Sequence, residues 1–110
     1  MPSMTPEKLG GEADLERALA APRFLLFKHS LVCPVSAAAF NEYRHFLAKS
    51  SVPTAWLDVR GQRPLSQAVE ARTGVPHESP QALLLEGGAV VWHASHGDIT
   101  RDSLRAAVGA

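Results

Sequence analysis

The order in which short apolar runs and helical patterns follow one another is the strongest constraint on the fold. The unbroken apolar run of residues 24–27, closed by Lys28 and His29, is typical of a central strand buried on both faces. Apolar residues recur every three or four positions before it, over 12–20, and after it, over 34–49. The sequence therefore predicts helix, strand and helix in its first half.

The second half adds a strand, a helix, two strands and a helix. Residues 54–59 have strand character, and the helical pattern that follows ends at Gly74. A right-handed crossover makes the first two strands parallel. The apolar runs 81–85 and 89–93 are separated by paired glycines, which predict an antiparallel hairpin. With a last helix capped by Thr100, the order is αβαβαββα, an α/β fold whose four-stranded mixed sheet is flanked by helices.

Length and composition suit one such domain. The chain has 110 residues, of which 45% are hydrophobic and 20% charged, and Gly10-Gly11 separates an expected loosely held arm, residues 1–11, from a single domain over residues 12–110. The 11 basic residues balance the 11 acidic ones, which disfavours nucleic acid and anionic membranes as partners. No signal peptide and no membrane span is apparent. We expect a cytoplasmic monomer with a small or neutral partner.

Cys33 is the only cysteine, which excludes an intramolecular disulfide, a Cys-x-x-Cys pair and an all-cysteine metal site within the chain. It lies between the first strand and the next helix, whose first position suits Pro34. The unpaired N–H groups and the dipole of a helix start favour a thiolate over a thiol. Cys33, with Pro34 beside it, is therefore predicted to be a catalytic nucleophile; the alternative is a buried structural cysteine.

Ser36 lies one turn beyond Cys33, at the position of the second cysteine of a Cys-x-x-Cys pair. Its hydroxyl can donate a hydrogen bond to the thiolate, or it can bond to the helix backbone, and both interpretations stay open. Because serine forms no disulfide, a mixed disulfide on Cys33 must be resolved by a thiol from another molecule. The predicted mechanism is monothiol.

The order αβαβαββα, with a cysteine at the start of its second helix, resembles that of the thioredoxin-like superfamily. This resemblance implies a cis peptide bond at Ser79-Pro80, just before the third strand, in a loop that faces the cysteine. It also implies that Ser79 offers backbone groups to an extended substrate. Without the resemblance a trans bond would be expected, because X-Pro bonds are cis in only about 5–6% of folded cases.

Three segments resemble the motifs of the monothiol bacilliredoxin family more specifically. They are FLLFKHSLVCPVS over 24–36, VPHESPQ over 75–81 and VVWHASHGDIT over 90–100, and the resemblance extends from about residue 12 to 108. Leu31 and Val32 depart from it, because they stand where a small hydroxylated residue is expected.

Membership of that family implies a thiol–disulfide oxidoreductase that removes bacillithiol from S-bacillithiolated client proteins. Bacillithiol is a small thiol that bears glucosamine and malate. It would act as cosubstrate with no bound cofactor, and a second bacillithiol or a partner reductase would free Cys33.

Other polar residues have candidate binding roles. Gly97, Asp98 and Thr100 lie in the loop that leads into the last helix, and because helix N-termini bind anions, the carboxylates of malate could dock there. The alternative is a plain turn and helix cap. Lys28 and His29 either place positive charge near Cys33 or face solvent as ordinary strand-end residues.

Metal binding is not expected, although the chain has five histidines. The best local pattern is His93-x-x-His96, and residues three apart in a strand face opposite sides of the sheet. With Cys33 assigned to redox chemistry, no metal site is predicted.

Two other functions stay open beside the oxidoreductase. One is an iron–sulfur carrier or redox sensor of the monothiol glutaredoxin type, although Pro34 restricts the geometry of a cluster and no Cys-Gly-Phe-Ser motif is present. The other is a redox-inert thioredoxin-like interaction domain, which predicts ordinary alkylation kinetics for Cys33.

Overall fold

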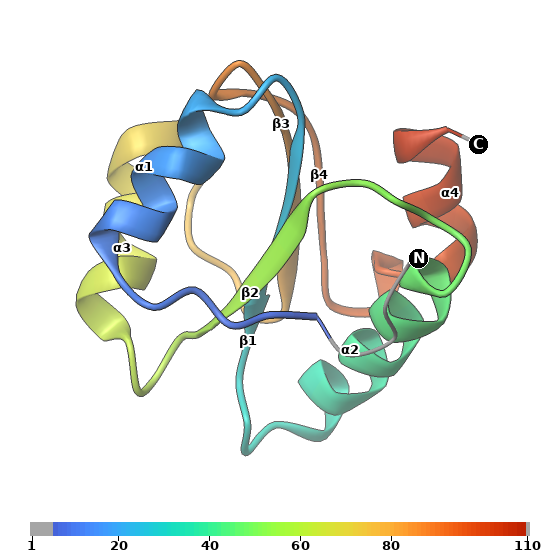
Figure 1. Ribbon diagram of the computed structural model, residues 1–110. Helices are drawn as coiled ribbons and strands as arrows, with labels where there is room; N and C mark the ends of the chain where they lie inside the picture. The colour runs from blue at the N-terminus through green and yellow to red at the C-terminus, as the bar shows by residue number, and fades with distance from the viewer. Residues whose placement is uncertain (1–5, 110) are drawn as a thin grey trace.

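The computed structural model describes residues 6–109 and shows a four-stranded mixed sheet between two layers of helices (Figure 1). The predicted order of elements is confirmed: α1 (Glu12–Ala20), β1 (Phe24–His29), α2 (Pro34–Leu47), β2 (Thr54–Asp58), α3 (Arg63–Thr73), β3 (Gln81–Glu86), β4 (Ala89–Ser95), the 3-10 turn η1 (His96–Asp98) and α4 (Arg101–Val108). In space the strands run β2-β1-β3-β4, with β1 and β2 parallel and the other pairs antiparallel. Helices α1 and α3 cover one face, and α2 and α4 cover the other.

Local sequence signals explain most of the element ends. Helix α3 ends at Gly74, whose φ of 74° is left-handed and whose N–H bonds to Glu70. The β3–β4 hairpin turns at Gly87 and Gly88, which both have positive φ, as a primed turn requires. Helix α4 is capped by Thr100, as predicted. No helix within residues 6–109 combines the length and the apolar character needed to cross a membrane.

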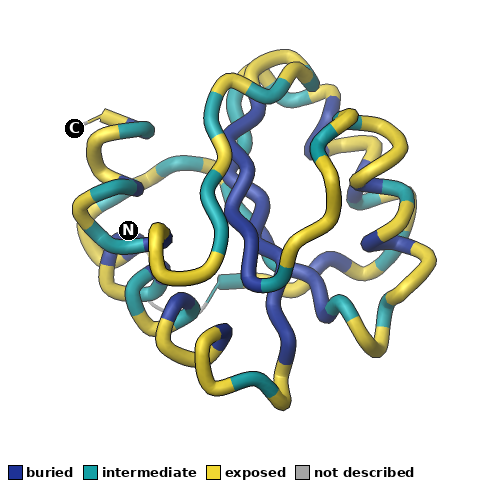
Figure 2. Tube along the Cα trace, turned by 180° about the vertical axis from the view of Figure 1, so that it is seen from behind, coloured by how far each residue is buried: buried dark blue, intermediate teal, exposed yellow. Residues whose placement is uncertain are grey.

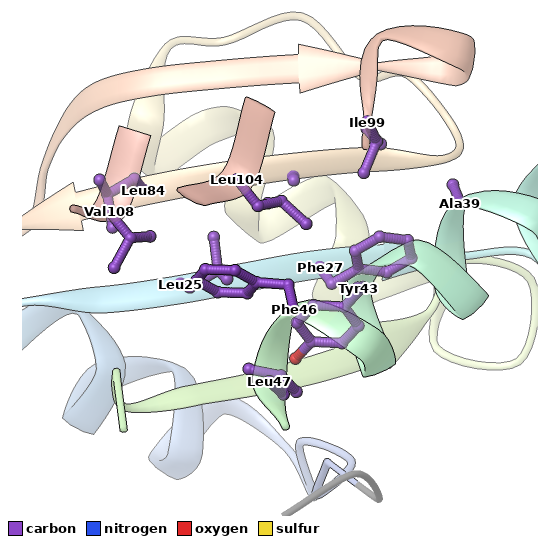
Figure 3. Packing of buried hydrophobic residues seen from close by; sticks show 11 residues of the cluster. Leu25, Phe27, Ala39, Tyr43, Phe46, Leu47, Leu84, Ile99, Leu104 and Val108 are labelled. Atoms are coloured by element: carbon purple, nitrogen blue, oxygen red, sulfur yellow. The ribbon is translucent and has the colours of Figure 1, made fainter. Parts of the chain in front are cut away.

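The core has two parts, one on each face of the sheet, and successive residues of β1 alternate between them. Leu25 and Phe27 pack toward α2 and α4, in the cluster drawn in Figure 3, whereas Leu26 packs toward α1 and α3. In Figure 2 the buried centre of the molecule comes mainly from β1, β2 and β3, whereas the edge strand β4 is partly exposed. The alternation continues beyond Phe27, so Lys28 faces the α1/α3 side and His29 the α2/α4 side.

Strand β1 is longer than the apolar run predicts, because Lys28 and His29 belong to it. Lys28 pairs with Leu57 of β2 and with Gln81 of β3, while His29 pairs with Asp58. Pairing with neighbours on both sides extends the strand past its last apolar residue.

The expectation of a loosely held arm does not hold for residues 6–11. Leu9 donates its N–H to the carbonyl of Trp56 at 2.8 Å, and the N–H of Trp56 bonds to the carbonyl of Glu7 at 3.0 Å. Leu9 is only 4% exposed and belongs to the core on the α1/α3 side. This segment pairs with the free edge of β2 and is part of the domain; residues 1–5 of the predicted arm lie outside the described residues.

Candidate active site

Cys33 is the N-cap residue of α2, at the end of the molecule where β1 ends. Its backbone is extended, its carbonyl accepts the first helical hydrogen bond from Ala37 at 3.0 Å, and Pro34 follows at the first helical position. The thiol is partly buried. The first N–H groups of a helix have no intrahelical partner, so Cys33 lies at the positive end of the α2 dipole.

Ser36 is fully buried and joins the start of α2 to the end of β1. Its Oγ accepts a hydrogen bond from the backbone N–H of Ser30 at 2.8 Å and lies 2.7 Å from Nδ1 of His29. These partners differ from both predicted ones, the Cys33 thiolate and the helix backbone. The hydroxyl therefore fixes the active-site turn against the strand below it.

His29 supports that turn from within the core rather than facing solvent. Its ring stacks on Phe40, with centroids 4.3 Å apart, and contacts the edge of Trp56. Burial lowers the pKa of His29 below its usual value, and the negative charge of Asp58 opposes the shift only in part. The ring is thus neutral at pH 7 and does not supply positive charge beside Cys33, which was one of the two alternatives for this residue.

Lys28 is also buried, on the opposite face of the sheet. Its side chain is 0% exposed, so the predicted solvent-facing alternative is wrong for it as well. Burial lowers the pKa of Lys28 to about 8, while the negative charge of Glu70 on α3 opposes the shift. Its charge therefore acts on the α3 side of the sheet, away from α2.

The peptide bond between Ser79 and Pro80 is cis, as the resemblance implies. Pro80 immediately precedes β3, whose first residue, Gln81, pairs with Lys28 near the end of β1. The cis-proline loop and Cys33 consequently lie at the same end of the sheet. Ser79 itself is held there with its hydroxyl buried.

At the start of α4, where the sequence leaves open either a site for a ligand carboxylate or a plain helix cap, side chains of the protein already bond to the backbone N–H groups of Arg101 and Ser103. The carboxylate of Glu42, on α2, accepts a hydrogen bond from the backbone N–H of Arg101 at 2.9 Å and another from its guanidinium at 2.7 Å. Thr100 and Ser103 form a capping box, and the hydroxyl of Ser103 also bonds to the carbonyl of Asp98. The structure favours the alternative of a plain turn and helix cap. Glu42 gave no signal in the sequence, because its partner lies 59 residues away.

Next to Cys33 runs a shallow apolar groove of about 410 Å³ between α2 and the turn before α4. Pro34 and Val35 line one wall, and Gly97 and Ile99 line the other. Leu31 and Val32, the residues that depart from the family motif, are 61% and 68% exposed. The surface around the thiol is thus apolar and open.

His96, the second histidine of the His93-x-x-His96 pattern, contacts the cis-proline loop. His96 lies 3.2 Å from the carboxylate of Glu78, which connects the cis-proline loop to the turn before α4. Residues 6–109 contain no group of three or more His, Cys, Asp or Glu side chains placed to hold a metal ion.

Comparison with known proteins agrees with this arrangement. The family model described as "Monothiol bacilliredoxin BrxC" matches residues 7–104. The chain belongs to the monothiol bacilliredoxin family. Family and fold together support a thiol redox function, for which Cys33 is the only thiol.

Solved structures show the same fold. A protein described as a candidate oxidoreductase with a thioredoxin fold is 34% identical, with a TM-score of 0.88 and 94% of each chain covered. A thioredoxin variant from Halobacterium salinarum is 15% identical, with a TM-score of 0.76 over 100% of this chain and 96% of that one. Mitochondrial thioredoxin 3 from Saccharomyces cerevisiae is 12% identical, with a TM-score of 0.71 over 92% and 91% of the two chains. The thioredoxins share the fold with this bacilliredoxin family member.

Proposed function

We propose that the chain is a monothiol thiol–disulfide oxidoreductase that removes bacillithiol from S-bacillithiolated proteins. The observation that carries the proposal is the position of the only cysteine, at the start of α2 and at the same end of the sheet as the cis-proline loop. Family membership supports bacillithiol as the small thiol. We place the reaction in the cytoplasm, where a free thiol stays reduced.

In the first step the Cys33 thiolate attacks the bacillithiol sulfur of the mixed disulfide. The bond from Cys33 to that sulfur forms while the bond between bacillithiol and the client breaks. The client sulfur leaves with the bonding electron pair and takes a proton from water. The client is thereby reduced to its thiol, and Cys33 carries the bacillithiol.

In the second step a thiolate from outside the chain attacks the bacillithiol sulfur held on Cys33. If that thiolate is a second bacillithiol, the products are bacillithiol disulfide and the free Cys33 thiolate. If it is a thiolate of a partner reductase, the bacillithiol is transferred to the reductase and Cys33 is again freed. Ser36 cannot replace it, since a hydroxyl forms no disulfide. The apolar surface of Leu31, Val32 and Val35 would contact the client during the first step.

Intact-mass spectrometry after incubation with bacillithiol disulfide tests the proposal. We expect one bacillithiol adduct on the wild type, its transfer from an S-bacillithiolated model protein to Cys33, and no adduct on Cys33→Ser. Ser36→Cys is a matched comparison, because a second thiolate at that position should attack the Cys33 sulfur, expel bacillithiol as its thiol and leave an internal disulfide in the chain. The proposal is wrong if the wild type forms no adduct, or if Cys33→Ser forms as much as the wild type.

A further inference from the structure

A polar recess lies at the same end of the sheet as Cys33, on the side covered by α3. It measures about 280 Å³ and lies between α3 and the segments that follow β2 and precede β3. We call it the Arg63 recess; its polar lining comes from Arg60, Arg63, Ser66, Gln67, Glu70 and His77.

The Arg63 recess is connected to both segments that frame the active site. Val59, in its wall, donates its N–H to the carbonyl of His29 at 3.0 Å, and His29 leads through Ser30 to Cys33. His77 lies two residues before Ser79 and three before the cis-proline, Pro80. The recess and Cys33 are therefore joined by short chain segments at one end of the sheet.

The charge of the recess lining favours an anion. Arg60 and Arg63 take part in no ion pair within residues 6–109. The one carboxylate of the lining, that of Glu70, already accepts a hydrogen bond from the backbone N–H of His77 at 2.8 Å. Burial, and then the positive charge of Lys28, lower the pKa of His77, so this ring is neutral at pH 7.

Lys28 adds a second, independent observation. It is fully buried, it faces the α3 side of the sheet, and its Nζ has no hydrogen-bond partner among residues 6–109. Glu70, whose negative charge acts on Lys28, and His77, whose pKa the charge of Lys28 lowers, both line the recess. A buried ammonium without a partner is unfavourable, and an anion in the recess would offset that penalty.

We propose that the Arg63 recess binds a carboxylate of the small thiol that Cys33 carries in the mixed disulfide. The identity of that thiol rests on the proposed function, and in bacillithiol the carboxylates belong to malate. The guanidinium groups of Arg60 and Arg63 can each present two donors to one carboxylate. The start of α4, the other place expected to take this group, is occupied by Glu42.

A titration of the wild-type chain with L-malate, followed by amide NMR, tests the recess without any reaction at Cys33. We expect saturable shifts at Arg63, Ser66, Glu70 and His77, and none with the neutral diamide of malate. Arg63→Gln should weaken malate binding about tenfold, the order expected for loss of a charge-assisted hydrogen bond. Arg105→Gln, on the exposed side of α4, is the matched control and should bind malate as the wild type does.

Lys28→Met tests the buried charge separately, because methionine keeps an unbranched side chain in the core. We expect a folded protein with weakened malate binding. Unchanged malate affinity in both Lys28→Met and Arg63→Gln overturns the proposal, as does a set of shifts that lies elsewhere on the molecule.

The rate of adduct formation on Cys33 connects the recess to the reaction. Arg63→Gln should slow the reaction with bacillithiol disulfide and leave the reaction with cystamine, which has no carboxylate, unchanged. If the wild type binds malate in the recess but forms no bacillithiol adduct, the recess is a carboxylate site and the proposed function is wrong. Two outcomes would leave the proposed function intact and show that the recess does not bind the small thiol. One is equally fast adduct formation in Arg63→Gln, and the other is a variant that slows only the reaction with an acidic client protein.

Discussion

Replacing Lys28 by methionine should change how the free energy of unfolding depends on pH. The burial of Lys28 determines the direction of that change. The pKa of Lys28 falls from 10.5 to about 8 on folding. Between these values the unfolded chain binds more protons than the folded one, so the contribution of Lys28 to the free energy of unfolding rises with pH. Over this window the full shift corresponds to roughly 3 kcal/mol. We expect about 2 kcal/mol to be observed between pH 7 and pH 10, because charges in proteins are partly screened.

The assay is urea denaturation of the wild type and Lys28→Met at both pH values. At pH 7 the methionine variant should be the more stable, since it carries no buried ammonium. At pH 10 the difference in unfolding free energy between the variant and the wild type should be smaller by about 2 kcal/mol, the change derived from the same pKa shift. Glu70, the carboxylate that acts on Lys28, is present in both chains, so the comparison isolates the lysine. The reasoning would be refuted if the difference in unfolding free energy between Lys28→Met and the wild type were the same at both pH values, or if Lys28→Met were the less stable protein at pH 7.

Three further outcomes are expected. Ser36→Ala should lower the free energy of unfolding by about 1–2 kcal/mol in urea denaturation, because it leaves His29 and a buried backbone N–H without their partner. Arg101 lowers the pKa of Glu42 to about 2. The stability that this ion pair contributes is therefore present above pH 4.5 and is lost as the pH falls toward 2. In acid unfolding, Glu42→Gln should reduce the loss of unfolding free energy over this range by about 0.5 kcal/mol, the order of an exposed ion pair. Iodoacetamide should alkylate Cys33 at pH 7 faster than it alkylates a cysteine in an unfolded peptide, and equal rates would favour a redox-inert interaction domain.

The sequence alone determined the order of elements and most of their ends. Pro34 at the first position of α2, Gly74 after α3 and the paired glycines of the hairpin are local signals, because each depends on the φ values or hydrogen bonds of neighbouring residues. The position of Cys33 at a helix start followed from the same signals. The cis bond at Pro80 did not, since the chemistry of an X-Pro bond favours trans and only the resemblance reversed that expectation.

Tertiary structure decided what the polar residues around Cys33 do. Lys28 and His29 are adjacent in the chain, yet the alternation of a strand sends them to opposite faces, and the elements packed on each face determine how far each is desolvated. Glu42 reaches the start of α4 only because α2 and α4 share one side of the sheet. Contacts of this kind join residues far apart in the chain and leave no local pattern, so the packing of the helices on the sheet determines the surroundings of the thiol.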